Sequence, residues 1–540
     1  MLSLRVLACL LCATVLMGTT ASHGQEPRFV RESLQTFVKD PAKLTSLLRG
    51  VWVMKSRNSA PKDSPEYRTS WEYWSAIHGY PGSTSPSGTL AAVKAGLTSR
   101  FPDDAPLLAG YFAGLKDLVP PPDPPGLADG VWATCEHSTP FFLAWHRMFL
   151  YYFERVLRDA SGDPGFALPY WDYTNDSVDP SQPANAPARI PVIFVAERLK
   201  TSGGDIDNPL FERRRTPGFG SAVHLDVLQT DVDSTLLIDD FLGFQNSLDG
   251  GLHGFIHCAV GNRCLAPYIG LVPFSGNDPV FWHHHANIDR LWDCWMVLHG
   301  ADKLPRDVPA WMDRQFEFVD EHGSPVSMQV SELFDPDGPI DYTYDNIDHC
   351  LRDETSAPSD GIAFINDVGE ATTMEVASRE EVSISGTDQT FLLANAFPEG
   401  SDAFLFAERP SILQPTRSTL RLEGVRIEGP PGSTVQIQLV NEGSSQRAFV
   451  GVLSFFADFD HAQHGASEEG RNFVFDVSAQ IQQLSAERVT GGGIGVAFVA
   501  SNGVVGDAPG VDAAGYEAAQ LRIRKIAIDV TSTSEPIDLK

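Results

Sequence analysis

The sequence predicts an α + β protein with two folded parts, a mainly helical region up to about residue 350 and a C-terminal β-sandwich. The chain has 540 residues, which is too long for one compact domain. Up to about residue 300, apolar side chains recur with helical spacing. Beyond the acidic, polar stretch 351–385 they alternate with polar side chains over short segments, as in half-buried strands.

The predicted elements define the expected domain boundaries. Helical patterns cover residues 44–54, 139–157, 253–258 and 280–299, and long loops rich in Pro, Asp and Arg join them. Alternating patterns, separated by Gly, Pro and Asn turns, cover residues 382–385, 418–423, 434–440, 449–455, 495–499 and 520–529. We therefore expect a helical domain at 25–350, a linker at 351–385 and a β-sandwich at 386–540.

The N-terminus predicts a secretory signal peptide at residues 1–24. Arg5 precedes the apolar stretch 6–17, which is too short to span a bilayer, and small residues follow it. No later stretch has the length and apolarity of a membrane helix. We expect a secreted or periplasmic protein without a membrane partner. The net charge of −30 argues against a nucleic-acid partner, because phosphate would be repelled.

The cysteine count also fits an exported chain with one unusual thiol. Cys9 and Cys12 lie in the predicted signal peptide, and the five others are Cys135, Cys258, Cys264, Cys294 and Cys350. Five is an odd number. In an oxidising compartment, one of these cysteines must do something other than pair within the chain.

Two histidine-rich segments in the second half of the helical region are candidate metal ligands. His253 and His257 are four residues apart, so both imidazoles lie on one helical face and can point at one ion. A zinc-protease motif is excluded, because Gly254 stands where that motif has its general-base Glu. The run His283–His285 has apolar flanks, and three buried imidazoles without a ligand role would be costly. A helix can direct at most one or two of them at one metal.

His137, His146 and His78 complete the candidate set. Nine residues separate His137 from His146, enough for a loop residue and a helix residue to converge, and His78 follows an aromatic helical segment. The candidates form two groups of three imidazoles, a donor set that suits copper or zinc. Three imidazoles leave an open position on each ion, and two such sites side by side could hold a diatomic molecule.

These segments resemble the type 3 copper family of tyrosinases, catechol oxidases and molluscan haemocyanins, over most of residues 70–300. The matching motifs are Trp145-His-Arg147, Leu168-Pro-Tyr-Trp-Asp172, the HxxxH at His253, and Asn277-Asp-Pro-Val-Phe-Trp282 running into His285-Ala-Asn-Ile-Asp-Arg290. The resemblance implies a four-helix-bundle core and two copper ions. It implies that the first copper is bound by His78, His137 and His146, and the second by His253, His257 and His285.

The resemblance extends to the C-terminal part. Tyr342-Thr-Tyr344 resembles the motif that closes the family's catalytic domain, and the segments from Arg421 and Phe449 resemble the β-domain of latent polyphenol oxidases and haemocyanins. That domain covers the copper site until proteolysis removes it, which implies an activating protease as a partner. Phe455 or Phe456 is a candidate plug residue, and ordinary core packing is an equal alternative.

The resemblance also gives the cysteines roles. In fungal and molluscan members, a Cys two residues before the second ligand forms a thioether with that histidine, and Cys135 has this spacing from His137. Four cysteines remain, and we expect the pairs Cys258–Cys264 and Cys294–Cys350. Free buried thiols are the alternative.

The implied activity is the oxidation of o-diphenols to o-quinones with O2. Phe281 is expected beneath the site and Val272 at its entrance. Asp289, Asn287 and backbone carbonyls are expected to fix the imidazole tautomers. Bacterial tyrosinases have Asn where this chain has Gly254, and a water-holding Glu where it has Asp249. Because Gly254 cannot orient a water and Asp249 is shorter, we expect diphenol oxidation to exceed monophenol hydroxylation.

Two rival functions share the histidine pattern. A haemocyanin-like O2 carrier would use the same copper pair without catalysis, but molluscan carriers chain many such units and this chain has one. A zinc hydrolase would need a general base near the HxxxH and would not need the Cys135 thioether.

Overall fold

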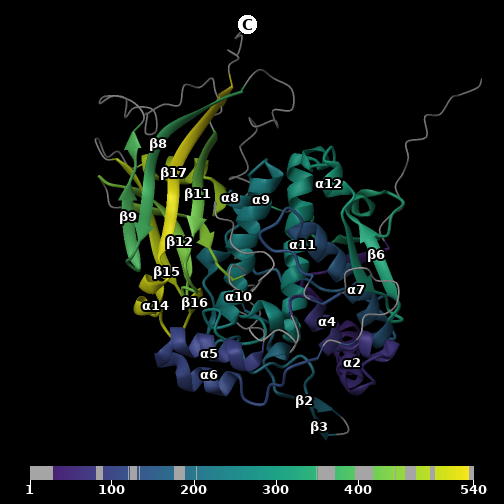
Figure 1. Cartoon of the computed structure of the whole chain (residues 1–540). Coiled ribbons are helices and arrows are strands. Elements are labelled where there is room, and N and C mark those ends of the chain that lie inside the picture. Colours follow the sequence, from purple (N-terminus) through teal and green to yellow (C-terminus); the bar gives the residue numbers. More distant parts are fainter. Residues whose placement is uncertain are drawn as a thin grey trace, which may run out of the picture.

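The structure is a computed structural model that describes residues 28–80, 89–119, 121, 131–132, 134–174, 189–201, 204–347, 350, 371–395, 417–443, 446–456, 470–486 and 493–533. The predicted signal peptide and residues 351–370 of the predicted linker lie outside these ranges. Figure 1 shows the two parts side by side, with the helical region next to the green and yellow strands of the C-terminal part. Among the described residues, no helix has the length and apolarity needed to cross a membrane.

Three long helices form the centre of the first part: α2 (Pro41–Ser56), α7 (Phe142–Ser161) and α11 (Pro279–His299). Asp40 and Asp278 cap α2 and α11 by accepting hydrogen bonds from backbone N–H groups of their first turns. Helix α7 ends at Gly162, whose φ of 65° is a left-handed conformation that glycine adopts without strain. Helix α7 is buried along most of its length and contacts both α2 and α11.

Shorter elements surround these helices. They are α1 (Leu34–Phe37), α3 (Pro65–Arg68), α4 (Trp71–Ile77), α5 (Leu90–Arg100), α6 (Ala105–Tyr111), α8 (Asp233–Leu236), α9 (Phe241–Leu248), α10 (Gly254–Val260), α12 (Pro309–Met312), and the hairpins β2 (Arg198–Thr201) with β3 (Gly204–Asp207) and β5 (Gln315–Val319) with β6 (Pro325–Gln329). A π-helical turn over Asp249–His253 joins α9 to α10. The helical patterns predicted from the sequence correspond to α2, α7, α10 and α11.

The beginning and the end of the helical region meet in a small parallel sheet. Strand β1 (Phe29–Arg31) pairs with β7 (Tyr342–Tyr344), the Tyr-x-Tyr segment. The fully buried Arg31 donates from Nε to Glu154 (2.8 Å) and from Nη1 to the Tyr344 hydroxyl (2.9 Å). The pairing therefore closes the helical region around a buried charge network.

The C-terminal part is a sandwich of two antiparallel sheets around one apolar core. The first sheet has the order β10-β8-β17-β11-β14 and the second β13-β12-β15-β9. The strands are β8 (Ala371–Ile384), β9 (Asp388–Leu392), β10 (Ala394–Asn395), β11 (Arg417–Arg426), β12 (Thr434–Asn441), β13 (Gln446–Leu453), β14 (Arg471–Asp476), β15 (Ile494–Ser501) and β17 (Leu521–Thr533), with helices α13 (Ser478–Ala486) and α14 (Ala513–Ala518).

One predicted boundary is wrong. The sequence assigned residues 351–385 to a linker, but residues 371–384 form β8, which pairs along its whole length with β17. The β-rich part therefore begins at Ala371, and only residues 351–370 remain as the connection.

The two parts are joined by several contacts besides the chain itself. Strand β16 (Val504–Val505) pairs with β4 (His224–Leu225) of the helical region. Arg100 at the end of α5 donates to the carbonyls of Pro430 and Gly515, in agreement with the position of α5 below the sandwich in Figure 1.

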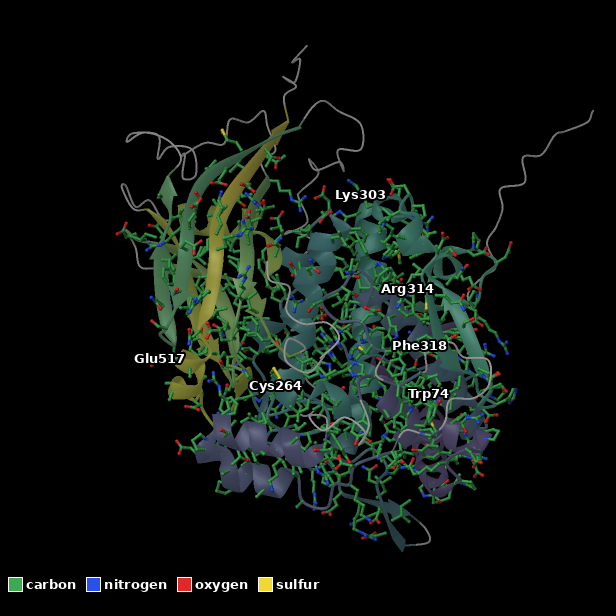
Figure 2. The ribbon with its side chains drawn as sticks, in the orientation of Figure 1. Trp74, Cys264, Lys303, Arg314, Phe318 and Glu517 are labelled. Atoms are coloured by element: carbon green, nitrogen blue, oxygen red, sulfur yellow. A yellow bond between two sulfur atoms is a disulfide. The ribbon has the colours of Figure 1, made fainter. Side chains whose placement is uncertain are left out.

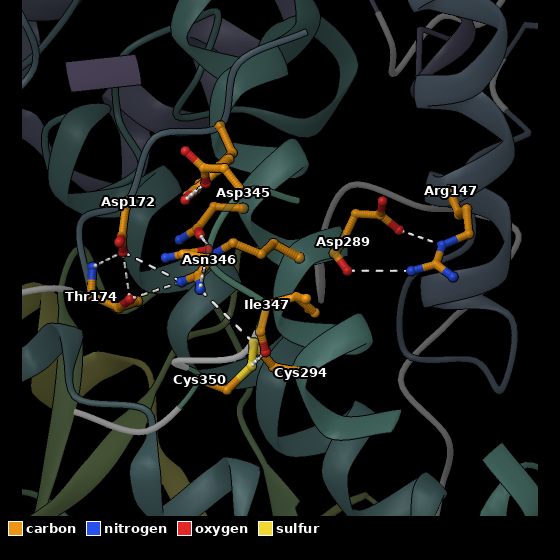
Figure 3. The surroundings of a disulfide bond; sticks show 12 residues. Arg147, Asp172, Thr174, Asp289, Cys294, Asp345, Asn346, Ile347 and Cys350 are labelled. Atoms are coloured by element: carbon orange, nitrogen blue, oxygen red, sulfur yellow. Dashed lines mark hydrogen bonds and ion pairs between the residues drawn. A yellow bond between two sulfur atoms is a disulfide. The ribbon is translucent and has the colours of Figure 1, made fainter. Parts of the chain in front are cut away.

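Both expected disulfide pairs are at bonding distance. Cys258 and Cys264 close a loop beside α10, and Cys264 lies between the helical region and the strands in Figure 2. Cys294 of α11 is joined to Cys350, just beyond the Tyr-x-Tyr segment (Figure 3). Cys135 is the free cysteine of the described residues.

Removing the Cys294–Cys350 bond is expected to lower the free energy of unfolding of the helical region by about 4 kcal/mol, because it closes a long loop in the unfolded chain. The sequence separation is 56 residues, against 6 for Cys258–Cys264. Urea unfolding of the double Cys→Ser variant measures the loss. The same double substitution at Cys258 and Cys264 is the comparison, and an equal or greater loss there would contradict the prediction.

Candidate metal centre

Two groups of buried side chains lie at the centre of the helical region. The first contains His78, which caps the C-terminus of α4, Cys135 and His137 from the preceding loop of α7, and His146 on α7. The second contains His253, at the end of the π-helical turn, His257 on α10, and His284 and His285 on α11. Within each group the potential ligand atoms lie within 4.8 Å of one another. The six histidines singled out in the sequence are all members.

Backbone carbonyls hold the imidazoles in one orientation. The Nδ1 atoms of His78, His146 and His257 lie 3.1, 2.7 and 2.6 Å from the carbonyl oxygens of Val272, Phe142 and Ile269, respectively. A carbonyl can only accept, so each Nδ1 carries the proton and each Nε2 presents its lone pair. The expectation that carbonyls fix the tautomers agrees with these contacts.

The Nε2 atoms of each group converge. His78 Nε2 lies 3.4 Å from His146 Nε2, and His257 Nε2 lies 3.3 Å from His285 Nε2. Burial first, and then the neighbouring imidazoles, hold the pKa of His257 and His285 well below the usual value, so both are neutral. Neutral imidazoles with converging lone pairs are suitable metal ligands.

The donor set fits a pair of copper ions. The Nε2 atom of the buried His253 has no hydrogen-bond partner among the described residues, and a metal would satisfy it. The second group offers imidazole nitrogen alone, and the first adds one thiol. Such a set favours copper over magnesium or calcium, which prefer oxygen.

Cys135 lies against the first group. Its sulfur is 3.3 Å from His137 Nδ1 and 3.5 Å from His146 Nε2, and the side chain is fully buried. Burial raises the pKa of this thiol well above its usual value. The contact is compatible with the predicted bond to His137.

Asp249 is a buried carboxylate beside the second group. Its Oδ1 lies 3.3 Å from His253 Nδ1, and its Oδ2 accepts the Ser138 backbone N–H (2.8 Å) and a bond from Arg471 of β14 (3.2 Å). Burial alone would raise the pKa of Asp249, but Arg471 and these hydrogen bonds lower it below its usual value. The carboxylate is therefore ionised and paired across the domain boundary.

Phe281 and Val272 are two predicted site residues that lie close to the histidine groups, and the predicted entrance role of Val272 stays a prediction. The Phe281 ring centroid is 4.2 Å from that of His285 and 4.8 Å from that of His78, so it supports both groups. Val272 is fully buried in a small cluster with Cys258 and Phe456. Any entrance at Val272 is therefore covered by the C-terminal part in this structure.

Phe456 from the C-terminal part reaches the second group. Its ring is stacked on His257, with centroids 3.8 Å apart and planes 10° apart, and it meets His253 edge-on at 5.8 Å. Phe455, the alternative plug in the sequence, belongs to the apolar core of the sandwich.

Asp289 has a different role from the one expected. It was predicted to orient ligand imidazoles, but it accepts hydrogen bonds from Arg147 (2.5 Å), Tyr342 (2.7 Å) and Tyr344 (2.6 Å) instead. Figure 3 shows the Arg147 pair. Asn287 accepts a bond from Arg290 Nε (2.8 Å).

Two polar side chains that were not predicted as site residues also contact the histidine groups. Ser275 Oγ lies 2.9 Å from His78 Nδ1, and the Tyr173 hydroxyl lies 2.8 Å from His284 Nδ1. Tyr173 directly follows the Trp-Asp motif, and Ser275 falls between Val272 and the Asn-Asp-Pro motif. Their position next to these motifs is the sequence signal from which both residues could have been predicted.

Fold and site together define a protein with a buried pair of histidine metal sites and a β-domain against them. The family model for the common central domain of tyrosinase matches residues 68–232 and 220–298, and that for the polyphenol oxidase middle domain matches 307–353. A tyrosinase of Streptomyces lincolnensis is 32% identical over 239 residues, 39% of this chain and 80% of that protein. The chain belongs to the tyrosinase family.

Other similarities extend over more of the chain. Tyrosinase HcTyr1 of Hahella sp. is 29% identical over 466 residues, covering 81% of this chain and 88% of that protein. The latent chloroplast polyphenol oxidase of Prunus armeniaca is 28% identical, but the match spans 38% of its length. A solved structure of latent aurone synthase has the same fold over 95% of this chain and 91% of its own, with a TM-score of 0.52 and 17% identity.

Proposed function

We propose that this protein is a di-copper oxidase that uses O2 to oxidise o-diphenols to o-quinones and is latent while its C-terminal domain covers the site. Family membership supports the copper oxidoreductase class. The observation that carries the latency is the stacking of Phe456 on His257, with 3.8 Å between ring centroids. A phenol ring cannot occupy that position at the same time.

In this proposal His78, His137 and His146 bind the first copper, and His253, His257 and His285 bind the second. When bound, the copper pair supplies the two-electron chemistry that couples diphenol oxidation to O2 reduction. His284 belongs to the second group but bonds Tyr173, so we assign it to support rather than to coordination.

The protein side chains supply orientation and proton transfer. The carbonyls of Val272, Phe142 and Ile269 fix three imidazoles, and Phe281 packs against both groups. Asp249 is the carboxylate next to His253, and it accepts the proton of an incoming diphenol once Arg471 has moved away. Gly254 adds no side chain to orient a water, which favours diphenols over monophenols.

The domain scheme follows from the same contacts. The catalytic domain is residues 25–350, and residues 371–540 form the shielding domain. We also infer export, since residues 1–24 have the features of a signal peptide and the two disulfides suit an oxidising compartment.

Catechol turnover before and after proteolysis between Cys350 and Ala371 tests the proposal. Cutting there spares both disulfides and every described strand and helix. We expect turnover to rise strongly once residues 371–540 are removed. A copper-loaded catalytic domain that binds O2 without oxidising catechol would instead be a haemocyanin-like carrier, and a zinc-loaded protein without copper absorption would be a hydrolase.

A thioether between Cys135 and His137 is expected in the copper-loaded protein. Forming the S–C bond removes the thiol hydrogen and one ring hydrogen, and O2 is the two-electron oxidant that takes up both hydrogens and leaves as hydrogen peroxide. Mass spectrometry of the peptide that contains both residues should show a mass lower by two hydrogens. The metal-free protein and a Cys135→Ser variant are the controls, and an unmodified peptide after copper loading would contradict the bond.

A further inference from the structure

The segment from Asp249 to Gly254 contains three glycines and therefore presents mainly backbone atoms to the C-terminal domain. Gly250, Gly251 and Gly254 lie in or next to the π-helical turn that leads into His253. A Cβ at Gly250 would lie 2.6 Å from the ring of Phe473 and 2.7 Å from Arg471 Nη2. Real Cβ atoms do not approach other atoms so closely, so the position requires glycine while the domain is docked.

The space is as tight at Gly254 and less tight at Gly251. A Cβ at Gly254 would lie 2.4 Å from Ser454 Oγ and 3.2 Å from the Cβ of Phe456, and one at Gly251 would lie 3.1 Å from the Val452 carbonyl oxygen. The Asn of bacterial tyrosinases could not replace Gly254 without displacing this strand end. Gly254 thus serves domain docking as well as the choice of phenol.

Hydrogen bonds also join this part of the helical region to the C-terminal domain. The Ser454 N–H donates to the Gly250 carbonyl at 2.6 Å. The Ser247 hydroxyl donates to the Val474 carbonyl (2.8 Å) and also accepts the Val474 N–H (3.1 Å). These bonds therefore connect the residue after β13 to the π-helical turn and strand β14 to α9.

Arg471 is the charged contact of the C-terminal domain with this segment, and a second ion pair between the two parts joins Arg417 of β11 to Asp239 at 2.8 Å. Its Nη2 lies 3.2 Å from Asp249 Oδ2, the Arg471 side chain is 14% exposed and the Asp249 side chain is 2% exposed. Asp249 in turn lies 3.3 Å from His253 Nδ1. Since a buried carboxylate is costly to leave unpaired, removing the guanidinium leaves a charge that favours opening of the interface to water.

We propose that Asp249–Gly254 is a built docking surface for the chain's own C-terminal domain, and that Arg471 holds the domain closed on it independently of Phe456. The Phe456 ring blocks the substrate position, whereas Arg471 forms an ion pair with Asp249, the carboxylate next to His253. Removing the plug ring alone therefore leaves the chain largely latent. This inference rests on the proposed latency.

The test compares full-length, copper-loaded variants that have not been cut. Arg471→Gln is expected to raise catechol turnover of the uncut chain by more than about tenfold, because truncating one partner of a buried ion pair mainly speeds dissociation. Phe456→Ala should give a smaller rise, and the double variant should approach the turnover of the domain-free enzyme. Gly250→Ala, on the helical side of the same interface, should also weaken docking, because the added Cβ would clash with Phe473 and Arg471.

Hydrogen exchange gives a readout that does not depend on turnover. The Ser454 amide donates to Gly250 in the closed chain, so Arg471→Gln and Gly250→Ala should speed its exchange. Gly96→Ala is the matched glycine control, since no atom beyond its own helical turn lies within 4 Å of its Cβ position. Arg522→Gln is the matched surface arginine. Neither control should change turnover or exchange.

Two results would overturn the proposal. One is full activity of the uncut Phe456→Ala chain with no effect of Arg471→Gln. The other is unchanged Ser454 exchange in both Arg471→Gln and Gly250→Ala. If the domain-free enzyme fails to oxidise catechol, the proposed function is wrong, but the exchange rates still decide whether Arg471 and the glycines hold the domain.

Discussion

Replacing His78 with alanine is expected to halve the copper content of the purified protein and to lower catechol turnover by at least about a thousandfold. His78 Nε2 converges with His146 Nε2 at 3.4 Å, and its Nδ1 is fixed by Val272 and Ser275. Without His78 the first group keeps only His137 and His146 as imidazole donors, too few to hold a copper that also binds O2. Copper per chain, measured by atomic absorption, and turnover after removal of the C-terminal domain measure the two effects.

His299→Ala is the control for this experiment. His299 is near the C-terminus of α11 and its Nε2 bonds the Leu236 carbonyl, away from both groups. That variant should keep two copper ions per chain and its activity. A His78→Ala protein with full copper content would remove His78 from the ligand set and assign the third position to another donor, for which Cys135 is the nearest candidate in the group.

Local sequence patterns were sufficient for much of the site. The four-residue spacing of His253 and His257 predicted that both rings lie on one side of a helical segment, and they lie at the end of the π-helical turn and on α10. The segment from Asp278 combines a helix cap with a buried apolar run, so α11 was predictable. These features depend on neighbours within a few residues. The disulfide pairs came from family resemblance rather than from such patterns.

Long-range packing was not predictable in the same way. Phe456 and Phe455 are adjacent in the sequence, and only the docking of the sandwich on α10 distinguishes the ring that reaches His257. Asp289 lies in a motif near a ligand, yet its partners include Arg31 from the beginning of the chain. Nothing local to either residue indicates these partners.

Composition misled the assignment of β8. The strand contains the charged run Arg379-Glu-Glu381 and begins next to an acidic stretch, which is typical of a linker. In the structure its partner is β17, which also carries charges: Glu380 is paired in register with Lys525, and Arg379 with Ile526. A strand whose exposed face is stabilised by opposite charges on its neighbour lacks the simple apolar alternation used for prediction.

Replacing Asp289 with alanine is expected to lower the free energy of unfolding of the helical region by about 3–5 kcal/mol, because it leaves Arg147 and Arg31 buried without their shared carboxylate. The Arg147 and Arg31 side chains are 4% and 0% exposed, and Asp289 also accepts from Tyr342 and Tyr344. Urea unfolding of the catalytic domain measures the loss. Asp337→Ala, at an exposed position of the same domain, should cost little, and a similarly small loss at Asp289 would contradict the prediction.

The pH dependence of this stability has a definite sign. Burial alone would raise the pKa of Asp289, but Arg147 and Arg31 lower it below the usual value of 3.8. A carboxyl whose pKa is depressed on folding contributes its full stability above that usual value and loses it as the pH falls through the folded pKa. The parent protein should therefore lose stability steeply below about pH 4, and Asp289→Asn should lose less over the same interval. Equal slopes in the two proteins would mean that other carboxylates, rather than this buried network, determine acid unfolding.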